Sequence, residues 1–327
     1  MCIRDRYAIL GRKGFFPIED AIAYLRKSSS PFEGHIERTI PGVEWSTGNL
    51  GQGLSVGCGF ALASKIKNIP YNVFVVMGDG EQQKGQISEA RRVAKKYFLN
   101  NLIGIVDLNG LQICGKIDSV MPSNIKDEYL SDGWEVIEID GHDFVQIYKA
   151  LKKAVFNLSS PTLILAHTIM GKGVSFMENN VEYHGRALNL EEYKKAMAEL
   201  NLEDDLSLFK RKREELSSFS YRRKPKNCII SIDIGKPRTY RNEKIDSRTA
   251  WGKALEDIAK INKSNPKFVP IAVIDCDLSP SVRTVNFSKI LPSNFIQCGI
   301  QEHCAATIAG ALSIEGILTF FADFGVC

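Results

Sequence analysis

A single stretch, residues 71–109, does most to define what this chain can fold into. Residues 71–77 form an apolar, β-branched run of strand length that ends at a Gly-Asp-Gly sequence. Residues 86–97 place apolar side chains at helical spacing, and residues 102–108 form a second apolar run that ends at Asn109. Strand, helix and strand make a βαβ unit, whose right-handed crossover predicts parallel strands with both carboxyl ends at one edge of a sheet.

Polar side chains stand where each of these strands ends, since Asp79 follows the first strand and Asn109 follows the second. A carboxylate and an amide oxygen at neighbouring strand ends suit Mg²⁺, which proteins hold through a few oxygen ligands together with phosphates and water. The pattern therefore predicts a magnesium ion that tethers a diphosphate. A structural alternative has Asp79 capping the next helix and Asn109 in an Asn-Gly turn, and these residues alone leave both interpretations open.

The length of 327 residues exceeds the ~250–300 residues at which a single core stops growing, so we expect two folded units. The first spans residues 1–217 and the second spans residues 247–327. Residues 218–246 have the Pro-, Gly- and charge-rich composition of a linker between domains. The expected fold class is α/β, with a parallel sheet flanked by helices and a second α/β domain.

Further elements follow from periodicity outside the βαβ unit. Residues 190–217 are charge-rich with spaced apolar residues and predict one long helix. A helix capped by Ser247 opens the second unit, and apolar runs at 268–274 and 295–300 predict two strands. The alternation of helix and strand resembles that of the first unit, which predicts a second, truncated α/β domain.

Composition and charge exclude several classes of function. The chain is 44% hydrophobic and 24% charged with a net charge of +4, which suits a phosphorylated substrate and is too mild to indicate nucleic acid. Its basic linker carries no nucleic-acid-binding motif, so a solvated connector is the better interpretation. Glu315 and Asp323 interrupt the apolar C-terminal run, so no stretch of about 20 residues is expected to cross a membrane. We expect a cytoplasmic protein.

The eight cysteines carry no recognisable site in the sequence. None forms a C-x-x-C pair, and no histidine stands at zinc-finger spacing from them. Cys298 and Cys304 flank the sequence GIQEH, but buried free thiols are the expected state in a chain with this much core.

The Gly-Asp-Gly sequence with its later asparagine resembles the thiamine-diphosphate motif, and its surroundings resemble transketolases in particular. The resemblance implies thiamine diphosphate and Mg²⁺ as cofactors, with Ca²⁺ as an alternative metal. It implies metal ligation by Asp79, Asn109 and the Leu111 carbonyl, with Gly78 and Gly80 beside the cofactor.

Three further segments of the first unit resemble the same family. The segment TGNLGQGLS resembles a cofactor-lining loop and implies contacts from Gly48 and Leu50, although its glycines also suit tight helix packing. His35 in Gly-His-Ile-Glu resembles a histidine that contacts substrate, where a solvated loop histidine is the alternative. His184 in Tyr-His-Gly resembles a second active-site histidine beside the diphosphate and the substrate.

The second unit resembles the pyrimidine-binding domain of transketolases. The resemblance implies that Arg248 and Ser281 contact the substrate phosphate and that Asp277 lies near the thiazolium and the substrate. As structural alternatives, Arg248 could pair with a helix acid, and Asp277 and Ser281 could stabilise the turn. Glu302 in GIQEH matches the family's catalytic acid, and an acid in the first turn of a helix is its structural alternative. The residues matched to the aromatic pair that stacks on the aminopyrimidine, with core packing as their alternative, are Phe321 and Phe324.

The implied activity is transfer of a two-carbon ketol unit from a ketose phosphate to an aldose phosphate. His35 and His184 would contact substrate hydroxyls, and Glu302 would share a proton with the pyrimidine ring. The family builds its sites between two subunits, which implies a homodimer of the full-length protein, and it carries an N-terminal segment and a C-terminal domain that this sequence lacks. The alternatives are a 1-deoxyxylulose-5-phosphate synthase and a noncatalytic subunit that retains the fold.

Overall fold

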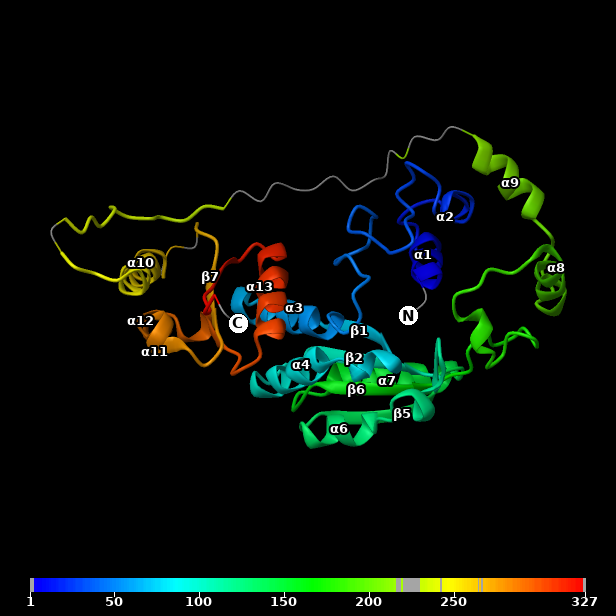
Figure 1. Cartoon of the computed structure of the whole chain (residues 1–327), viewed down its shortest axis with the longest axis horizontal. Coiled ribbons are helices and arrows are strands. Elements are labelled where there is room, and N and C mark those ends of the chain that lie inside the picture. Colours follow the sequence, from blue (N-terminus) through cyan, green and yellow to red (C-terminus); the bar gives the residue numbers. More distant parts are fainter. Residues whose placement is uncertain are drawn as a thin grey trace.

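A computed structural model describes residues 3–215, 219, 230–241, 243–263, 265 and 267–325 of the chain. Two parallel sheets organise these residues (Figure 1). The first sheet has the strand order β1-β2-β6-β5, and every neighbouring pair of strands is parallel. Its strands are β1 (Val73–Gly78), β2 (Leu102–Leu108), β5 (Glu135–Asp140) and β6 (Thr162–His167). The predicted fold class, a parallel α/β sheet flanked by helices, is therefore confirmed.

The βαβ unit forms where the sequence predicts it. Helix α4 (Gly85–Lys96) joins β1 to β2, and the register pairs Val73 with Leu102 and Gly78 with Asp107. The apolar positions of α4 face the core, which explains why this segment is helical: Ile87, Ala90, Val93 and Ala94 are buried. Both strands consequently end at the same edge of the sheet.

Helices cover both faces of the first sheet, as is usual for parallel strands. On one face, α3 (Gly53–Lys67), α4 and α6 (Ile125–Ser131) share a core with the second sheet. On the other face, α7 (Phe144–Phe156) packs Ala150 and Ala154 against the apolar side chains of β2 and β6. Alternate residues of β2 and β6 enter the two cores, so these central strands are buried from both sides, whereas Phe74 and Val76 on one face of β1 are exposed.

The N-terminal segment forms a core of its own around α1 (Ile3–Arg12) and α2 (Ile18–Tyr24). Helix α9 (Leu206–Glu214) contacts α2, where Arg213 Nη1 donates to the Ala23 carbonyl at 2.7 Å. Chain segments that are distant in sequence therefore lie side by side at this end of the molecule.

One predicted helix is wrong. The expected single helix at 190–217 is two helices, α8 (Leu190–Glu199) and α9, and residues 216–218 lie outside the described residues. Asn201 has φ of +53°, a left-handed conformation that cannot continue a right-handed helix and that asparagine adopts more readily than most residues. The break turns α9 back towards α2.

The second sheet has the strand order β8-β7-β9 and is also parallel. Its strands are β7 (Ile271–Asp275), β8 (Phe295–Gln297) and β9 (Leu318–Phe321), so the strands predicted at 268–274 and 295–300 are shorter than expected or begin later. Helices α10 (Ser247–Asn262) and α12 (Val285–Ile290) share a core with this sheet.

The predicted cap of α10 is also wrong. Asp246, not Ser247, is the N-cap, since its Oδ1 accepts the backbone N–H of Thr249 at 2.9 Å. A carboxylate is as good a cap as a hydroxyl, so the start of this helix lies one residue from the expected place. Part of the predicted linker at 218–246 lies outside the described residues.

Helix α13 (Glu302–Ile314) packs on α3 and brings the two sheets together (Figure 1). The contact is close at Gly59, where an added Cβ would lie 2.5 Å from the Cβ of Ala311. Only a glycine permits this approach, because a Cβ atom essentially never lies closer than 3.0 Å to another heavy atom of this kind. The position of Glu302, the first residue of α13, is thereby tied to the first sheet.

Short elements complete the fold. No helix among the described residues is long and apolar enough to span a membrane. The short elements are η1 (Gly80–Gln83), β3 (Leu111–Gln112), β4 (Gly115–Lys116), α5 (Ile117–Val120), η2 (Val181–His184), α11 (Ser279–Val282) and η3 (Pro292–Asn294).

Candidate functional site

The carboxylate of Asp79 joins the ends of β1 and β2. Its Oδ1 accepts the N–H of Gly80 at 2.7 Å, and its Oδ2 accepts the N–H groups of Asn109 at 2.9 Å and Gly110 at 2.6 Å. The side chain is 3% exposed. The parallel register places these groups together, so the predicted meeting of the two strand ends is present.

Asn109 lies in the turn that the structural alternative proposed, because its Oδ1 accepts the N–H of Leu111 at 3.0 Å. Asp79 likewise caps η1. These contacts do not use every acceptor position. Each of these oxygens has two lone pairs, so Asp79 Oδ1 and Asn109 Oδ1, with one hydrogen bond each, keep one position for a cation.

Burial makes the Asp79 carboxylate electrostatically costly. It raises the pKa of Asp79 above the ordinary value, the nearby charge of Asp107 raises it further, and the three backbone N–H groups oppose the rise. A divalent cation would compensate the buried negative charge. The electrostatics of this edge therefore fit a metal ion.

The glycine loop before α3 is held to the same edge by Glu81, a residue that the sequence interpretation did not single out. Its carboxylate accepts the N–H of Gly51 at 2.8 Å and the N–H of Gly78 at 3.1 Å. The only signal in the sequence is an acid at the start of the element that follows Asp79. In the same loop, an added Cβ at Gly48 would lie 3.4 Å from the ring of His35, so these two predicted site residues are neighbours.

An unsatisfied donor marks the same edge. The Nε2 atom of Gln112 is buried and has no hydrogen-bond partner among the described residues. Its side chain lies beside Gly80, where an added Cβ would be 3.1 Å from Gln112 Oε1. A buried N–H donor without a partner is unfavourable, and an anionic ligand oxygen would satisfy it. This observation fits a diphosphate at the strand ends.

His184 is less tightly placed than the strand-end residues. It is exposed and ends η2, which contacts β3, the strand that begins at Leu111. Leu50 is also exposed, on the glycine loop. Neither side chain has a hydrogen bond to the Asp79 edge within the part of the chain that the structure describes.

Glu302 begins α13, and two residues of α4 orient that helix. Glu89 Oε2 accepts the N–H of Cys304 at 2.8 Å, and Gln86 Nε2 donates to Thr307 Oγ1 at 2.8 Å and to Ser55 Oγ at 3.1 Å. An acid that accepts a first-turn N–H stabilises a helix start. The helix of the βαβ unit therefore positions the predicted catalytic acid, which the sequence pattern alone did not indicate.

The predicted phosphate contacts come together at the second sheet. Arg248 Nη1 donates to Ser281 Oγ at 3.2 Å, and both lie at the carboxyl edge of the sheet, where α11 begins after β7. Arg248 also lies 3.8 Å from Asp246, the helix-acid pairing that was its alternative. The guanidinium is more than half exposed, so it can bind an anion.

Asp277 has a left-handed backbone with φ of +65°, and its N–H donates to Gln297 Oε1 at 2.7 Å. Gln297 Nε2 in turn donates to the buried Asp275 Oδ1 at 2.7 Å. A non-glycine residue in this conformation is costly and persists where its surroundings enforce it. Gln297 is thus a positioning residue for the loop after β7 that sequence reasoning missed.

The two predicted aromatic residues differ in burial. Phe321 lies in β9 and packs against the main core, which agrees with its structural alternative. Phe324 follows the strand and is 40% exposed, so it can contact a ligand.

The parallel sheet joins an acid and an amide at neighbouring strand ends and is linked to a second parallel sheet. This architecture is consistent with the class of α/β proteins that bind thiamine diphosphate. The sequence profile of the family described as "Transketolase, thiamine diphosphate binding domain" matches residues 5–225. The chain belongs to the transketolase family.

Individual relatives agree with this assignment. A Phocaeicola vulgatus protein, named as one subunit of an apulose-4-phosphate transketolase, is 37% identical over 201 residues, covering 61% of this chain and 71% of that protein. Mus musculus transketolase is 32% identical over 325 residues, covering 97% of this chain and 49% of the mouse protein. The crystal structure of Campylobacter jejuni transketolase matches with a TM-score of 0.81 at 27% identity, covering 98% of this chain and 54% of that one. The chain therefore spans about half the length of these two transketolases.

Proposed function

We propose that this chain supplies the cofactor-binding part of an enzyme that transfers a two-carbon ketol unit from a ketose phosphate to an aldose phosphate. Membership of the transketolase family supports the reaction type. The observation that carries the proposal is the joining of two strand ends by Asp79, which leaves acceptor positions on Asp79 and Asn109. We further propose that the division at residues 1–217, 218–246 and 247–327 separates the diphosphate-binding and pyrimidine-binding domains and that the protein acts in the cytoplasm.

The metal ligands in this proposal are Asp79, Asn109 and the Leu111 carbonyl. All three offer oxygen atoms, which is the donor set of Mg²⁺ and Ca²⁺. Gln112, whose buried Nε2 has no partner among the described residues, would donate to a diphosphate oxygen. Gly78 and Gly80 would provide backbone without side chains beside this position, and Gly48 and Leu50 lie in the loop that Glu81 ties to Gly78.

When bound, thiamine diphosphate supplies a carbon that can attack a carbonyl and stabilise the negative charge that develops. Glu302 would hydrogen-bond a ring nitrogen of the cofactor, and α4 fixes the start of its helix, because Glu89 accepts the N–H of Cys304. Phe324, and Phe321 behind it, would present aromatic surface to the ring.

The substrate contacts follow from charge and exposure. Arg248 and Ser281 would bind the phosphate group, through hydrogen bonds that the guanidinium charge strengthens. His35 and His184 would bind substrate hydroxyl groups and exchange protons with them. Asp277, fixed by Gln297, would orient the sugar between these groups.

The proposed assembly is a homodimer of the full-length protein, with each site completed by the second copy. A split arrangement is the second candidate, because the Phocaeicola vulgatus relative is named as one subunit of its transketolase. Size-exclusion chromatography with light scattering measures the mass of the purified protein in solution. The homodimer proposal predicts twice the mass of one chain, whereas a split enzyme predicts that activity appears only after a second, different chain is added.

The test of the proposal is calorimetric titration of the chain with thiamine diphosphate, with and without Mg²⁺. We expect binding that requires Mg²⁺ and that Asp79→Asn weakens by at least about 100-fold, because the variant loses the charged metal ligand. Asp140→Asn is the matched control, since Asp140 ends β5, which lies at the opposite side of the same sheet from β1. Equal affinity in Asp79→Asn and Asp140→Asn, or no binding with Mg²⁺ in excess, would overturn the proposal.

A further inference from the structure

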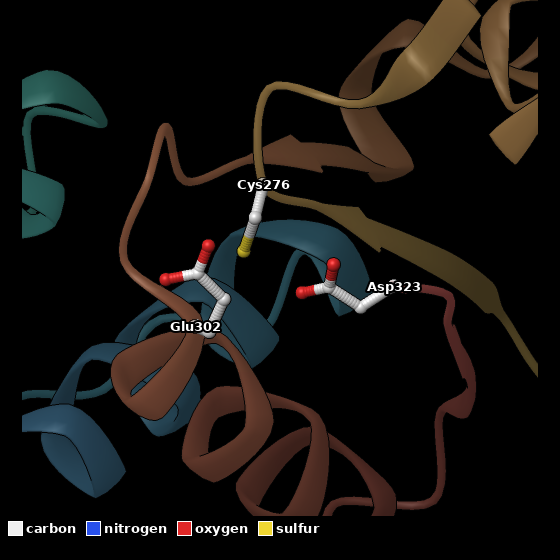
Figure 2. Close-up of side chains that lie close together, drawn as sticks. All are labelled: Cys276, Glu302 and Asp323. Carbon is white, nitrogen blue, oxygen red and sulfur yellow. The ribbon is translucent and has the colours of Figure 1, made fainter. Parts of the chain in front are cut away.

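Three side chains capable of binding a metal converge at the carboxyl edge of the second sheet. Figure 2 shows Cys276, Glu302 and Asp323 with the sulfur directed between the two carboxylates. One ligand atom from each residue lies within 4.8 Å of the other two. Cys276 is 1% exposed, and both acids are half-buried. None of these three residues lies at the ends of β1 and β2, where Asp79 and Asn109 meet.

The topology explains the convergence. Strands β7 and β9 are adjacent and parallel, so Cys276 after β7 and Asp323 after β9 emerge at the same edge. Helix α13 begins there with Glu302. Because three separate elements each contribute one ligand, the group is a tertiary feature and not a run of acids on one loop.

We propose that Cys276, Glu302 and Asp323 form a binding site for a borderline or soft divalent cation, Zn²⁺ or Cd²⁺. A thiolate with two carboxylates is a donor set for such ions and not for Mg²⁺, which takes oxygen ligands only. Ligand atoms around Zn²⁺ at ~2.0–2.3 Å from the ion lie roughly 3.5 Å apart, so small side-chain rotations close the present separation.

Gln301 supplies an independent sign of an absent ligand. Its backbone N–H donates to the Gly299 carbonyl at 2.8 Å and also interacts with the Cys276 sulfur, and its Oε1 is buried with no hydrogen-bond partner among the described residues. An unpaired buried oxygen is unfavourable, and a water bound to a metal ion would donate to it. With three protein ligands, the fourth position of a tetrahedral ion is open to such a water.

Binding of a metal ion to Cys276 requires that its thiol release a proton. Burial, with the neighbouring carboxylates of Glu302 and Asp323, raises the pKa of Cys276 to about 12. The thiol is consequently protonated near neutral pH. On binding, the S–H bond breaks, a sulfur–metal bond forms, and the proton leaves to solvent, so that one positive charge remains to offset the two carboxylates.

Occupancy of this site would affect the proposed transketolase function, and only this consequence rests on that function. Glu302 cannot ligate a metal and share a proton with the cofactor ring at once, so the ion would compete with thiamine diphosphate. The Mg²⁺ site at Asp79 would be unaffected, because its oxygen ligands lie on the first sheet.

The test is titration of the 327-residue chain with Cd²⁺ alone, followed by the ultraviolet charge-transfer band of the cadmium–thiolate bond. Cys114, which is exposed, and Cys2, Cys228 and Cys327, which lie outside the described residues, are first replaced by serine so that they do not bind the probe. We expect one Cd²⁺ per chain, no displacement by excess Mg²⁺, and loss of the band in Cys276→Ser. Glu302→Gln and Asp323→Asn preserve side-chain size and should each weaken Cd²⁺ binding by at least about tenfold. Mutation of a residue that only hydrogen-bonds to a metal ligand already costs this much, so loss of a direct ligand should cost no less.

Cys298→Ser is the matched control, because Cys298 is equally buried in the same core but is not in the group. Circular dichroism confirms that each variant is folded. The inference is overturned if the wild-type chain shows no band, if Cys276→Ser retains it, or if Cys298→Ser removes it while Cys276→Ser does not. Thiamine diphosphate is absent throughout, so failure of the proposed function leaves this outcome unchanged.

Discussion

The acids at the carboxyl edges of the two sheets differ in how many hydrogen bonds hold them in place. At the first sheet, Asp79 accepts three backbone N–H groups and its position is fixed. At the second, the buried Asp275 is also held by three hydrogen bonds, but the half-buried Glu302 accepts none from the described residues and Asp323 accepts one, from the N–H of Phe324. The same parallel-strand topology thus produces one edge whose acid is fixed and one edge where two acids keep open acceptor positions. We infer that the first is built to hold an ion, and that the second needs a ligand to complete it.

The largest expected effect tests the second edge. Glu302→Gln keeps size but removes the acid, so two-carbon transfer by the full-length protein should fall by about 10²–10⁴-fold, the usual contribution of an acid–base group. The measurement is the rate of transfer between sugar phosphates. Glu315→Gln is the control, because Glu315 caps the far end of α13 and pairs with Lys67. Unchanged turnover in Glu302→Gln would remove this residue from the mechanism.

The packing of α4 on α6, beneath the first sheet, includes Arg91, whose side chain is buried between the two helices. Arg91 pairs with Asp132 at 2.7 Å and with Glu128. Arg91→Met leaves two acids without their cation and should lower the free energy of unfolding by about 3–5 kcal/mol.

Urea denaturation measures this effect on Arg91. Arg92→Met, at an exposed position of the same helix, should stay within about 0.5 kcal/mol of the wild type. Equal free energies of unfolding for the two variants would mean that the contacts of Arg91 with Glu128 and Asp132 do not stabilise the fold.

The contact between the two regions is tested at Gly59. Gly59→Ala places a methyl group against Ala311 of α13 and should destabilise the fold by about 1–3 kcal/mol, as overpacking does. Gly85→Ala, at the start of α4, meets no atom within 4 Å and serves as the control in thermal unfolding. If both variants unfold at the same temperature, α13 does not pack on α3 as described.

The smallest effect is the pH dependence that Asp79 imposes. Because burial raises the pKa of Asp79, the folded chain binds this proton more tightly than the unfolded chain. In EDTA, the stability linked to Asp79 is therefore present below its ordinary pKa and is lost as pH rises through the raised value. Mg²⁺ binds the ionised form, so its affinity should rise over the same range. Thermal unfolding of the wild type and of Asp79→Asn across this range measures both, and identical profiles would contradict the assignment.

Local patterns were sufficient to predict the first edge. The apolar runs and the helical spacing of residues 71–109 are set by neighbours in the chain, and the crossover rule then places Asp79 next to Asn109. Arg248 and Ser281, which the resemblance matched to substrate-phosphate contacts, lie within hydrogen-bond distance of each other. The roles of the site residues all stay predictions, and no contact in the described chain joins His184 or Phe324 to the strand ends.

What the sequence did not predict depends on contacts between distant segments. The break after α8 was missed because Leu200 and Leu202 continue the apolar pattern across Asn201. The Glu81 carboxylate and Gln297 Oε1 accept backbone N–H groups, which no side-chain pattern encodes. The group of Cys276, Glu302 and Asp323 forms only when β7, β9 and α13 meet.

The most direct test of the central claim is anomalous X-ray diffraction from crystals of the chain grown with Mn²⁺ and thiamine diphosphate. We predict one manganese peak within bonding distance of the Asp79 carboxylate, the Asn109 amide oxygen and the Leu111 carbonyl. Cofactor bound with the manganese elsewhere, or no peak at these three atoms, would contradict this claim.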